Sequence, residues 1–300
     1  MAELVSDELW KQIEPLLPPL PQDAHWAKVP TIGRNDMDLH LTGKKALITG
    51  ASRGIGFAVA KCLVGEGAAV RIAARPGERI EKATAALREA GAKDFAAYGL
   101  DLALTEKRAE LVERCGDVDI LVNCAGVIPR QTIEEMSEAE WRESWELKLF
   151  GSVDLTRRYY ARMKEQRGGV IINVIGSAGL RPDYKFAAGS VANSALMSLT
   201  SALGGVSPDF NVRIVGVNPG SVRTERTLDR LKQVAKQRFG DENRWSELEQ
   251  ESVKTQPFGH TQKPEQMAAV IAFLASDHAQ YITGTTITVD GGASARTIPH

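Results

Sequence analysis

The chain has 300 residues, of which 43% are hydrophobic and 25% charged, the ordinary mixture of a folded globular protein. Its 37 basic and 38 acidic side chains give a net charge of −1, which argues against a protein that coats DNA or an anionic membrane by charge. Three cysteines are too few for a disulfide framework, so we expect a cytoplasmic protein. No apolar run approaches the roughly 20 residues of a membrane helix. Together with the net charge, this predicts neither nucleic acid nor membrane as a partner.

Residues 1–40 are rich in proline, and we expect them to form an arm separate from the rest of the chain. Leu9, Ile13 and Leu16 recur at helical spacing, and the prolines between 15 and 21 end that pattern. The pattern predicts a short amphipathic helix followed by an extended tether. A surface arm of this kind would pack on the domain or on a partner subunit.

From Lys44 onward, apolar segments alternate with amphipathic ones. The apolar segments are continuous hydrophobic runs, which is typical of strands covered on both faces of a parallel sheet. Strands are predicted at 44–50, 68–75, 94–102, 118–126, 168–176, 211–220 and 285–292. Helices are predicted at 55–66, 78–90, 105–114, 137–166, 187–203 and 265–274, with a polar helical stretch up to about 253. Repeated β-α-β units predict an α/β fold with a doubly wound sheet in one domain over 41–300.

The first predicted strand leads into a glycine-rich turn, and a helix follows it. This strand–turn–helix context makes the glycine spacing of TGASRGIG specific for binding nucleotide phosphates. Gly50 permits the tight turn, and Gly54 lets a pyrophosphate approach the backbone. Gly56 lets the helix pack closely on the strand. Free N–H groups at the start of the helix would then face the phosphates.

Four motifs in this order resemble the short-chain dehydrogenase/reductase family. They are TGASRGIG at 49–56, NCAG at 123–126, NPGSVRT at 218–224 and ITGTTITVDGG at 282–292. The resemblance covers about residues 40–293. It implies a Rossmann-type, mostly parallel seven-stranded sheet with helices on both faces, a nicotinamide cofactor, a small-molecule substrate and a homodimer or homotetramer.

The same resemblance assigns residues to the cofactor. Asp101 would lie at the adenine ring, Asn123 and Gly126 beside the ribose, and Thr224 near the carboxamide. Further contacts implied within or next to these motifs are Ser52, Ile55, Leu102, Ala125, Pro219, Gly220 and Val222.

The end of the second predicted strand bears on the choice of cofactor. Sites for NAD place an acidic side chain there, which accepts a hydrogen bond from the ribose 2′-hydroxyl. In this chain that position falls at Ala74, Arg75 follows it, and Arg53 lies in the glycine turn. Two guanidinium groups and no carboxylate favour a 2′-phosphate. We therefore predict NADP(H) rather than NAD(H), with ordinary surface charges as the alternative reading of the two arginines.

The family transfers protons through Asn, Ser, Tyr and Lys, and local register puts other residues at all four positions. The asparagine position holds Lys148, the serine position Gly176, the tyrosine position Gly189 and the lysine position Asn193. The thirteen residues from Gly176 to Gly189 and the four from there to Asn193 keep the family's spacing. We therefore expect this chain to depart from the usual mechanism.

The residues at these positions indicate a rearranged proton-transfer site. An exchange between Lys148 and Asn193 would return an ammonium to the same cavity. Tyr184 is the candidate for the missing phenol, with its pKa lowered by that ammonium, and Ser177 is the candidate hydroxyl donor. Two alternatives stay open: Tyr184 as a packing residue, and Lys148 as a ligand of the cofactor or of a substrate carboxylate.

The charged stretch 225–255 follows the third motif, and the resemblance implies that it forms a substrate lid; a solvated helix pair is the alternative. The five histidines show no metal-ligand spacing, so we expect no metal site.

We predict an oxidoreductase that moves a hydride between a nicotinamide cofactor and a small alcohol or ketone. The alternatives are a cofactor-binding protein with a sensor or structural role, and another reaction such as dehydration or isomerisation.

Overall fold

The computed structural model describes residues 38–296, so nearly all of the predicted arm at 1–40 lies outside the described residues. From Leu39 onward the chain forms one compact unit. Its centre is a seven-stranded sheet in the order β3-β2-β1-β4-β5-β6-β7, in which every pair of neighbouring strands is parallel. The predicted doubly wound sheet is confirmed, and it is parallel throughout.

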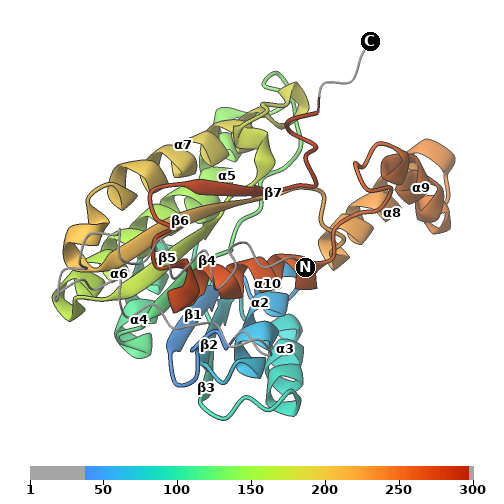
Figure 1. The fold of residues 1–300 in the computed structure, drawn as a ribbon. Helices are drawn as coiled ribbons and strands as arrows, with labels where there is room; N and C mark the ends of the chain where they lie inside the picture. The colour runs from blue at the N-terminus through green and yellow to red at the C-terminus, as the bar shows by residue number, and fades with distance from the viewer. Residues whose placement is uncertain (1–37, 297–300) are drawn as a thin grey trace, which may run out of the picture. The chain divides into compact units, whose positions relative to one another are not determined.

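The strands and helices follow the predicted alternation along the chain (Figure 1). The strands are β1 Lys45–Thr49, β2 Ala69–Ala74, β3 Phe95–Gly99, β4 Ile120–Asn123, β5 Gly169–Val174, β6 Val212–Pro219 and β7 Thr286–Val289. The helices are α2 Gly54–Gly65, α3 Glu78–Glu89, α4 Thr105–Cys115, α5 Glu138–Trp145, α6 Ser152–Gln166, α7 Ala187–Gly204, α8 Glu225–Phe239, α9 Trp245–Lys254 and α10 Pro264–Ala275.

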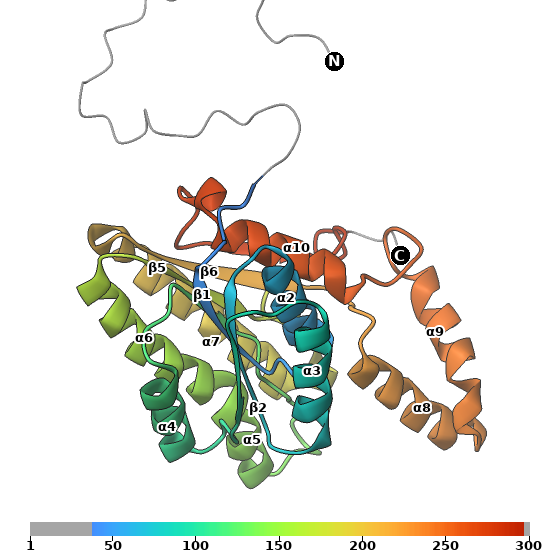
Figure 2. The ribbon, with the colours of Figure 1, turned by 90° about the horizontal axis from the view of Figure 1, so that it is seen from below.

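Helices cover both faces of the sheet. Helices α2, α3 and α10 lie on one face, and α4 to α7 lie on the other (Figures 1 and 2). Because side chains alternate along a strand, Ala46 and Ile48 of β1 pack on the first face, and Leu47 packs on the second. All three side chains are fully buried, which is why the strand sequence is a continuous apolar run.

The strand order places a crevice at the carboxyl ends of β1 and β4. From β1 the chain goes to β2 and β3 on one side, and it returns to β4 on the other side of β1. The loops that leave β1 and β4 therefore diverge, and ligands of open α/β sheets bind in that gap.

The predicted single helix at 137–166 is interrupted. Ser137 begins α5 with a capping box, in which its hydroxyl accepts from the N–H of Glu140 and its own N–H donates to the Glu140 carboxylate. Residues Glu146–Gly151 then form a π-helical turn before α6 starts. The predicted long helix is present, with one π turn in place of an α turn, a difference that the helical pattern of the sequence does not reveal. Such turns are frequent at functional sites, and this one carries Lys148.

Helices α8 and α9 follow β6 and stand apart from the sheet in both views (Figures 1 and 2). They pack on each other, with Ala235 of α8 and Leu248 of α9 buried, and Arg238 of α8 forms an ion pair with Glu251 of α9. Within residues 38–296, no helix combines the length and hydropathy of a membrane span.

Candidate active site

A cavity of about 860 Å³ opens at the carboxyl ends of the central strands. Its walls come from the glycine turn, from the loops after β2, β3, β4 and β5, and from the start of α8. This volume lies within the range of cofactor and small-ligand sites. The predicted cofactor residues that line it are Gly50, Ser52, Arg53, Gly54, Ile55, Gly56, Arg75, Asp101, Leu102, Ala125, Gly126, Pro219, Gly220 and Thr224.

The glycine turn lies against the loop that follows β4. A Cβ atom on Gly50, whose φ is +69°, would come within 2.8 Å of the Ala125 Cα, and one on Gly56 would come within 2.6 Å of the Gly50 carbonyl oxygen. The hydroxyl of Thr49 accepts from the N–H groups of Cys124 and Ala125, at 3.1 Å each. These contacts bring the N–H groups at the start of α2 to the cavity, and the glycines of the turn put no side chain of their own in front of them, which fits a dinucleotide pyrophosphate.

Two predicted cofactor residues lie outside the cavity lining. Asn123 is buried, and its amide donates to the Thr156 hydroxyl at 3.0 Å and to the Asn173 side-chain oxygen at 2.9 Å. Val222 is also buried and forms an isolated parallel bridge with Gln262. In this structure both residues hold neighbouring segments together behind the cavity wall.

The far end of the cavity, after β2, is rich in arginine. Arg75 and Arg79 line it, together with the carboxylates of Glu78 and Asp101. The Asp101 carboxylate accepts from the N–H of Ala103 at 3.1 Å, which shapes the loop after β3. Arg79 was missed in the sequence analysis. Its place in the first turn of the helix that follows the second strand was the feature of the sequence that could have identified it as a cavity residue.

The N-terminal part of α8 places two carboxylates on the glycine turn. The N–H of Gly54 donates to Glu225 Oε2 at 3.2 Å, and Arg53 Nη1 donates to Asp229 Oδ2 at 3.0 Å. Thr224 caps α8 by accepting from the N–H of Thr227. The N–H of Gly54 and the guanidinium of Arg53 are the groups expected to receive phosphate, so carboxylates of α8 occupy them in this structure.

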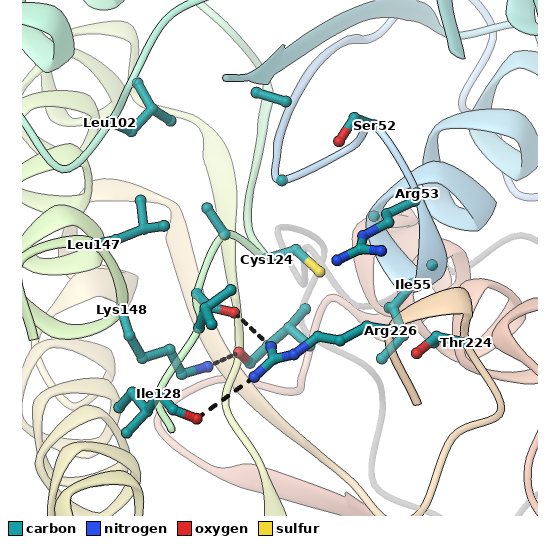
Figure 3. Close-up of a pocket in the computed structure, with 18 of the residues that line it drawn as sticks. Ser52, Arg53, Ile55, Leu102, Cys124, Ile128, Leu147, Lys148, Thr224 and Arg226 are labelled. Atoms are coloured by element: carbon teal, nitrogen blue, oxygen red, sulfur yellow. Dashed lines mark hydrogen bonds between the residues drawn. The ribbon is translucent and has the colours of Figure 1, made fainter. Parts of the chain in front are cut away.

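Lys148 reaches into the cavity from the π turn (Figure 3). Its Nζ donates to the carbonyl oxygens of Val174 at 2.7 Å and Ile175 at 2.9 Å, at the end of β5. Its stem fills the space beside Gly126, where a Cβ atom would overlap Lys148 Cδ. Burial lowers the pKa of Lys148 to about 8; nearby Cys124 acts in the opposite direction, and Arg226 in the same direction as burial. An ammonium has three donors, and only two of them have partners in the part of the chain described here.

Ser177 and Asn193 line the same cavity as Lys148. The Asn193 side-chain nitrogen lies 2.9 Å from where a Cβ on Gly176 would stand. A Cβ on Gly189 would overlap the ring of Phe186, so that ring fills the space beside the predicted tyrosine position. The structure therefore brings three of the four predicted catalytic residues to one cavity.

Tyr184, the fourth, is not among the residues that line the cavity. Its side chain is 63% exposed, and its hydroxyl donates to Glu134 Oε2 at 2.8 Å. This hydrogen bond to a carboxylate raises the pKa of Tyr184, because it favours the protonated phenol. The predicted lowering of that pKa by Lys148 is therefore wrong, since the phenol faces Glu134 on the outer surface.

Two arginines at the chemical end of the cavity were also missed from the sequence. Arg226 donates to the carbonyl oxygens of Gly126 at 3.1 Å and Ile128 at 3.5 Å, and burial lowers its pKa, as do Arg53 and Arg230. Arg130 pairs with Asp183, and its guanidinium lies 5.4 Å from the centre of the Phe186 ring. Arg226 comes two residues after the third motif, which was the available signal.

Residues 38–296 contain no group of three or more His, Cys, Asp and Glu side chains arranged to hold a metal ion. The cavity itself offers a phosphate cradle at one end and ammonium, guanidinium, hydroxyl and amide groups at the other.

The chain is similar to known proteins over most of its length. The model of the short chain dehydrogenase family matches residues 44–235. An uncharacterized oxidoreductase of Thermotoga maritima is 32% identical over 259 residues, covering 86% of this chain and 100% of its own. The 2,3-dihydro-2,3-dihydroxybenzoate dehydrogenase of Bacillus subtilis is 32% identical over 261 residues, covering 85% and 97%. L-sorbose reductase from Gluconobacter frateurii, solved with NADPH and L-sorbose, superposes with a TM-score of 0.80 at 30% identity, covering 86% and 98%.

Proposed function

The chain belongs to the short-chain dehydrogenase family, and from this premise we propose that it is an NADP(H)-dependent oxidoreductase for a small alcohol or ketone, with Lys148 as its proton-transfer group. The observation that carries the proposal is the position of Lys148. Its ammonium lies in the cavity with a pKa of about 8 and one donor to spare. The 225–255 segment serves as the lid.

The cavity supports a nicotinamide cofactor bound along its length. The bare glycine turn would hold the pyrophosphate, and Arg53 and Arg75 would hold the 2′-phosphate. Asp101 and Leu102 would border the adenine, and Thr224 would lie near the carboxamide. When bound, the cofactor supplies or accepts the hydride. The NADPH complex of a relative with a TM-score of 0.80 supports this choice of cofactor.

Lys148 would handle the proton of the reaction. In reduction its ammonium gives a proton to the carbonyl oxygen as that oxygen gains charge, and in oxidation its neutral amine takes the proton of the hydroxyl. A pKa of about 8 suits both tasks near neutral pH. The carbonyl oxygens of Val174 and Ile175 hold Nζ in place, and Ser177 and Asn193 offer further hydrogen bonds to the substrate oxygen. Tyr184 carries no step in this proposal.

The test is cofactor binding followed by turnover. Calorimetry should give a lower Kd for NADP+ than for NAD+, and the absorbance of the reduced nicotinamide should change with members of a panel of ketones and alcohols. Tighter binding of NAD+ would overturn the cofactor assignment. Binding of cofactor without turnover of any compound would support the alternative, a cofactor-binding protein with a sensor or structural role. That alternative is favoured by Gly176 and Gly189, which have no side chain at the positions where the family has its serine and tyrosine.

The carboxylates of α8 should compete with the cofactor. Glu225→Gln and Asp229→Asn should each lower the Kd of NADP+ by about two- to fivefold, because a phosphate then no longer displaces a charged partner from Gly54 or Arg53. Calorimetry at fixed ionic strength measures the change, with Glu242→Gln as the control, since Glu242 is exposed outside the cavity. An unchanged or higher Kd in both variants would show that these contacts do not compete with phosphate.

A further inference from the structure

The chemical end of the cavity holds two cations that face one another. Lys148 comes from the π turn and Arg226 from α8, and their charged ends approach from opposite walls (Figure 3). Their hydrogen-bond acceptors are neutral backbone carbonyls, belonging to Val174 and Ile175 for Lys148 and to Gly126 and Ile128 for Arg226.

No carboxylate of the described residues pairs with either cation. Four other arginines of the described residues do have such a partner: Arg53 pairs with Asp229, Arg130 with Asp183, Arg223 with Glu249 and Arg238 with Glu251. The only carboxylates among the described residues that line the cavity belong to Glu78, at the start of α3, and to Asp101, on the loop after β3, at its other end.

Two desolvated cations without a counter-ion are unfavourable. Burial lowers the pKa of Lys148, and Arg226 lowers it further, against the opposite effect of Cys124. The pKa of Arg226 is itself lowered by burial and by the positive charges of Arg53 and Arg230. A carboxylate placed between them would remove this repulsion, and a guanidinium binds a carboxylate through two parallel hydrogen bonds. The cavity is therefore electrostatically incomplete until an anion enters this end.

The phosphates of the cofactor have other partners. The cradle at Gly54 and the arginines at 53 and 75 lie on the glycine turn and after β2, whereas Arg226 is anchored on the loop after β4 and Lys148 at the end of β5. Arg53 also acts electrostatically on Arg226, so a cofactor phosphate is the competing partner of that guanidinium. Because Arg226 is anchored on the loop after β4 and its charged end faces Lys148, the anion of this end is assigned to the substrate.

We propose that Arg226 and Lys148 bind an acidic group of the substrate, so that the enzyme acts on small oxo acids or hydroxy acids in preference to neutral ketones and alcohols. The inference rests on the proposed function. The substrate carboxylate lies against the guanidinium of Arg226, and the adjacent oxygen that is reduced or oxidised faces Lys148. The proton transferred to that oxygen comes from Lys148, and the hydride comes from NADPH.

The first experiment compares each acid with its own amide. With NADPH, 2-oxo and 3-oxo acids of increasing chain length are assayed beside their primary amides, such as pyruvate with pyruvamide and acetoacetate with acetoacetamide, and beside L-sorbose as a neutral ketone. We expect kcat/KM to be about tenfold or more higher for the favoured acid than for its amide, as expected when a charge-assisted pair is lost. Equal or better turnover of the amides, or a preference for L-sorbose, overturns the proposal.

The second experiment tests Arg226 itself. Arg226→Gln should lower kcat/KM for the acid by about 10- to 100-fold, chiefly through KM, and should change that for the amide by less than about threefold. Arg226→Lys should recover part of the loss, and Arg88→Gln, exposed in the last turn of α3 outside the cavity lining, should behave as wild type. If Arg226→Gln instead weakens NADP+ binding and affects acid and amide equally, the arginine serves a cofactor phosphate and the proposal fails.

A binding measurement separates this inference from the proposed function. Calorimetry with pyruvate and pyruvamide, on the protein alone and with NADP+, should detect the acid and not the amide, and Arg226→Gln should abolish the difference. This outcome supports the acidic subsite even if no substrate is turned over, in which case only the proposed reaction fails. Equal binding of acid and amide by the wild-type protein overturns the subsite whatever the turnover assay gives.

Discussion

Replacing Lys148 by methionine should lower kcat for carbonyl reduction by about 10²- to 10⁴-fold, the usual contribution of a general acid. Methionine keeps most of the apolar stem that fills the space beside Gly126 but has no proton to give. Burial already disfavours the charged amine, as its lowered pKa indicates, so the variant should fold. The measurements are steady-state kinetics with NADPH, the Kd of NADPH, and thermal unfolding.

Lys93→Met is the matched control, because Lys93 is exposed on the loop before β3 and does not line the cavity. It should match the wild-type rate. If Lys148→Met also keeps the wild-type kcat, the proton comes from another group, and the proposed mechanism is wrong.

The pH profile gives a second readout of Lys148. The protonated amine is the acid for reduction, so kcat/KM should be constant well below pH 8 and fall about tenfold per pH unit above it. Oxidation needs the neutral amine, so its kcat/KM should rise through the same range. Lys148→Arg, whose charge does not titrate here, should have lost this inflection. A profile of Lys148→Arg with the wild-type inflection would assign the titration to a different group.

The second large effect is expected at the end of β2. Ala74→Asp combined with Arg75→Ala should raise the Kd of NADP+ by about 10- to 100-fold and lower that of NAD+. Ala74 lines the cavity and is the last residue of the strand, so a carboxylate there would repel a 2′-phosphate and accept from a 2′-hydroxyl. Removing Arg75 would also remove a charge-assisted partner of the phosphate.

Calorimetry with both cofactors, at two salt concentrations, measures this change in preference. Arg88→Ala is the control, because Arg88 lies in the last turn of α3 outside the cavity lining. If the double variant keeps the wild-type Kd for both cofactors, Arg75 is an ordinary surface charge and the basis for choosing NADP(H) is lost.

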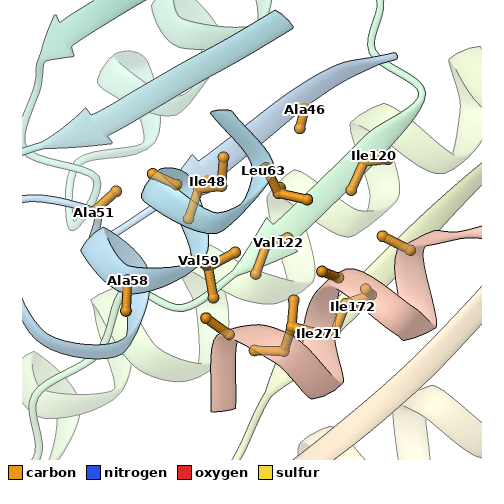
Figure 4. Packing of buried hydrophobic residues seen from close by; sticks show 14 of the residues in the cluster. Ala46, Ile48, Ala51, Ala58, Val59, Leu63, Ile120, Val122, Ile172 and Ile271 are labelled. Carbon is orange, nitrogen blue, oxygen red and sulfur yellow. The ribbon is translucent and has the colours of Figure 1, made fainter. Parts of the chain in front are cut away.

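The fold could be read from the sequence because its causes are local. Buried strands such as β1 and β4 show continuous apolar runs, and their side chains meet those of α2 and α10 in one cluster (Figure 4). Gly56 of the first turn is likewise dictated by short-range packing, since a Cβ there would meet the carbonyl of Gly50. Patterns of this kind depend on residues within a few positions of each other.

The π turn is a feature that the periodicity of the sequence does not predict. The sequence from 137 to 166 has helical spacing throughout, yet the extra residue per turn at 146–151 decides which side chains face the cavity. From this turn Lys148 donates a hydrogen bond to the carbonyl oxygen of Val174 at the end of β5, a residue more than twenty positions later in the sequence. By contrast Tyr184, close to Gly189 in sequence, turns outward to Glu134.

The sequence by itself determined the doubly wound sheet, the phosphate cradle and the resemblance to a family of dehydrogenases. Only the tertiary structure decided what stands at the chemical end of the cavity. Arg226 meets the carbonyl of Gly126 across one hundred residues, and Glu225 meets Gly54 across 171. The hydrophobic period and the glycine spacing reflect the structure of a single helix, strand or turn, so they can be recognised in the sequence. Charges from different elements interact only after the sheet has brought their loops together. The facing cations Lys148 and Arg226 are a product of that assembly.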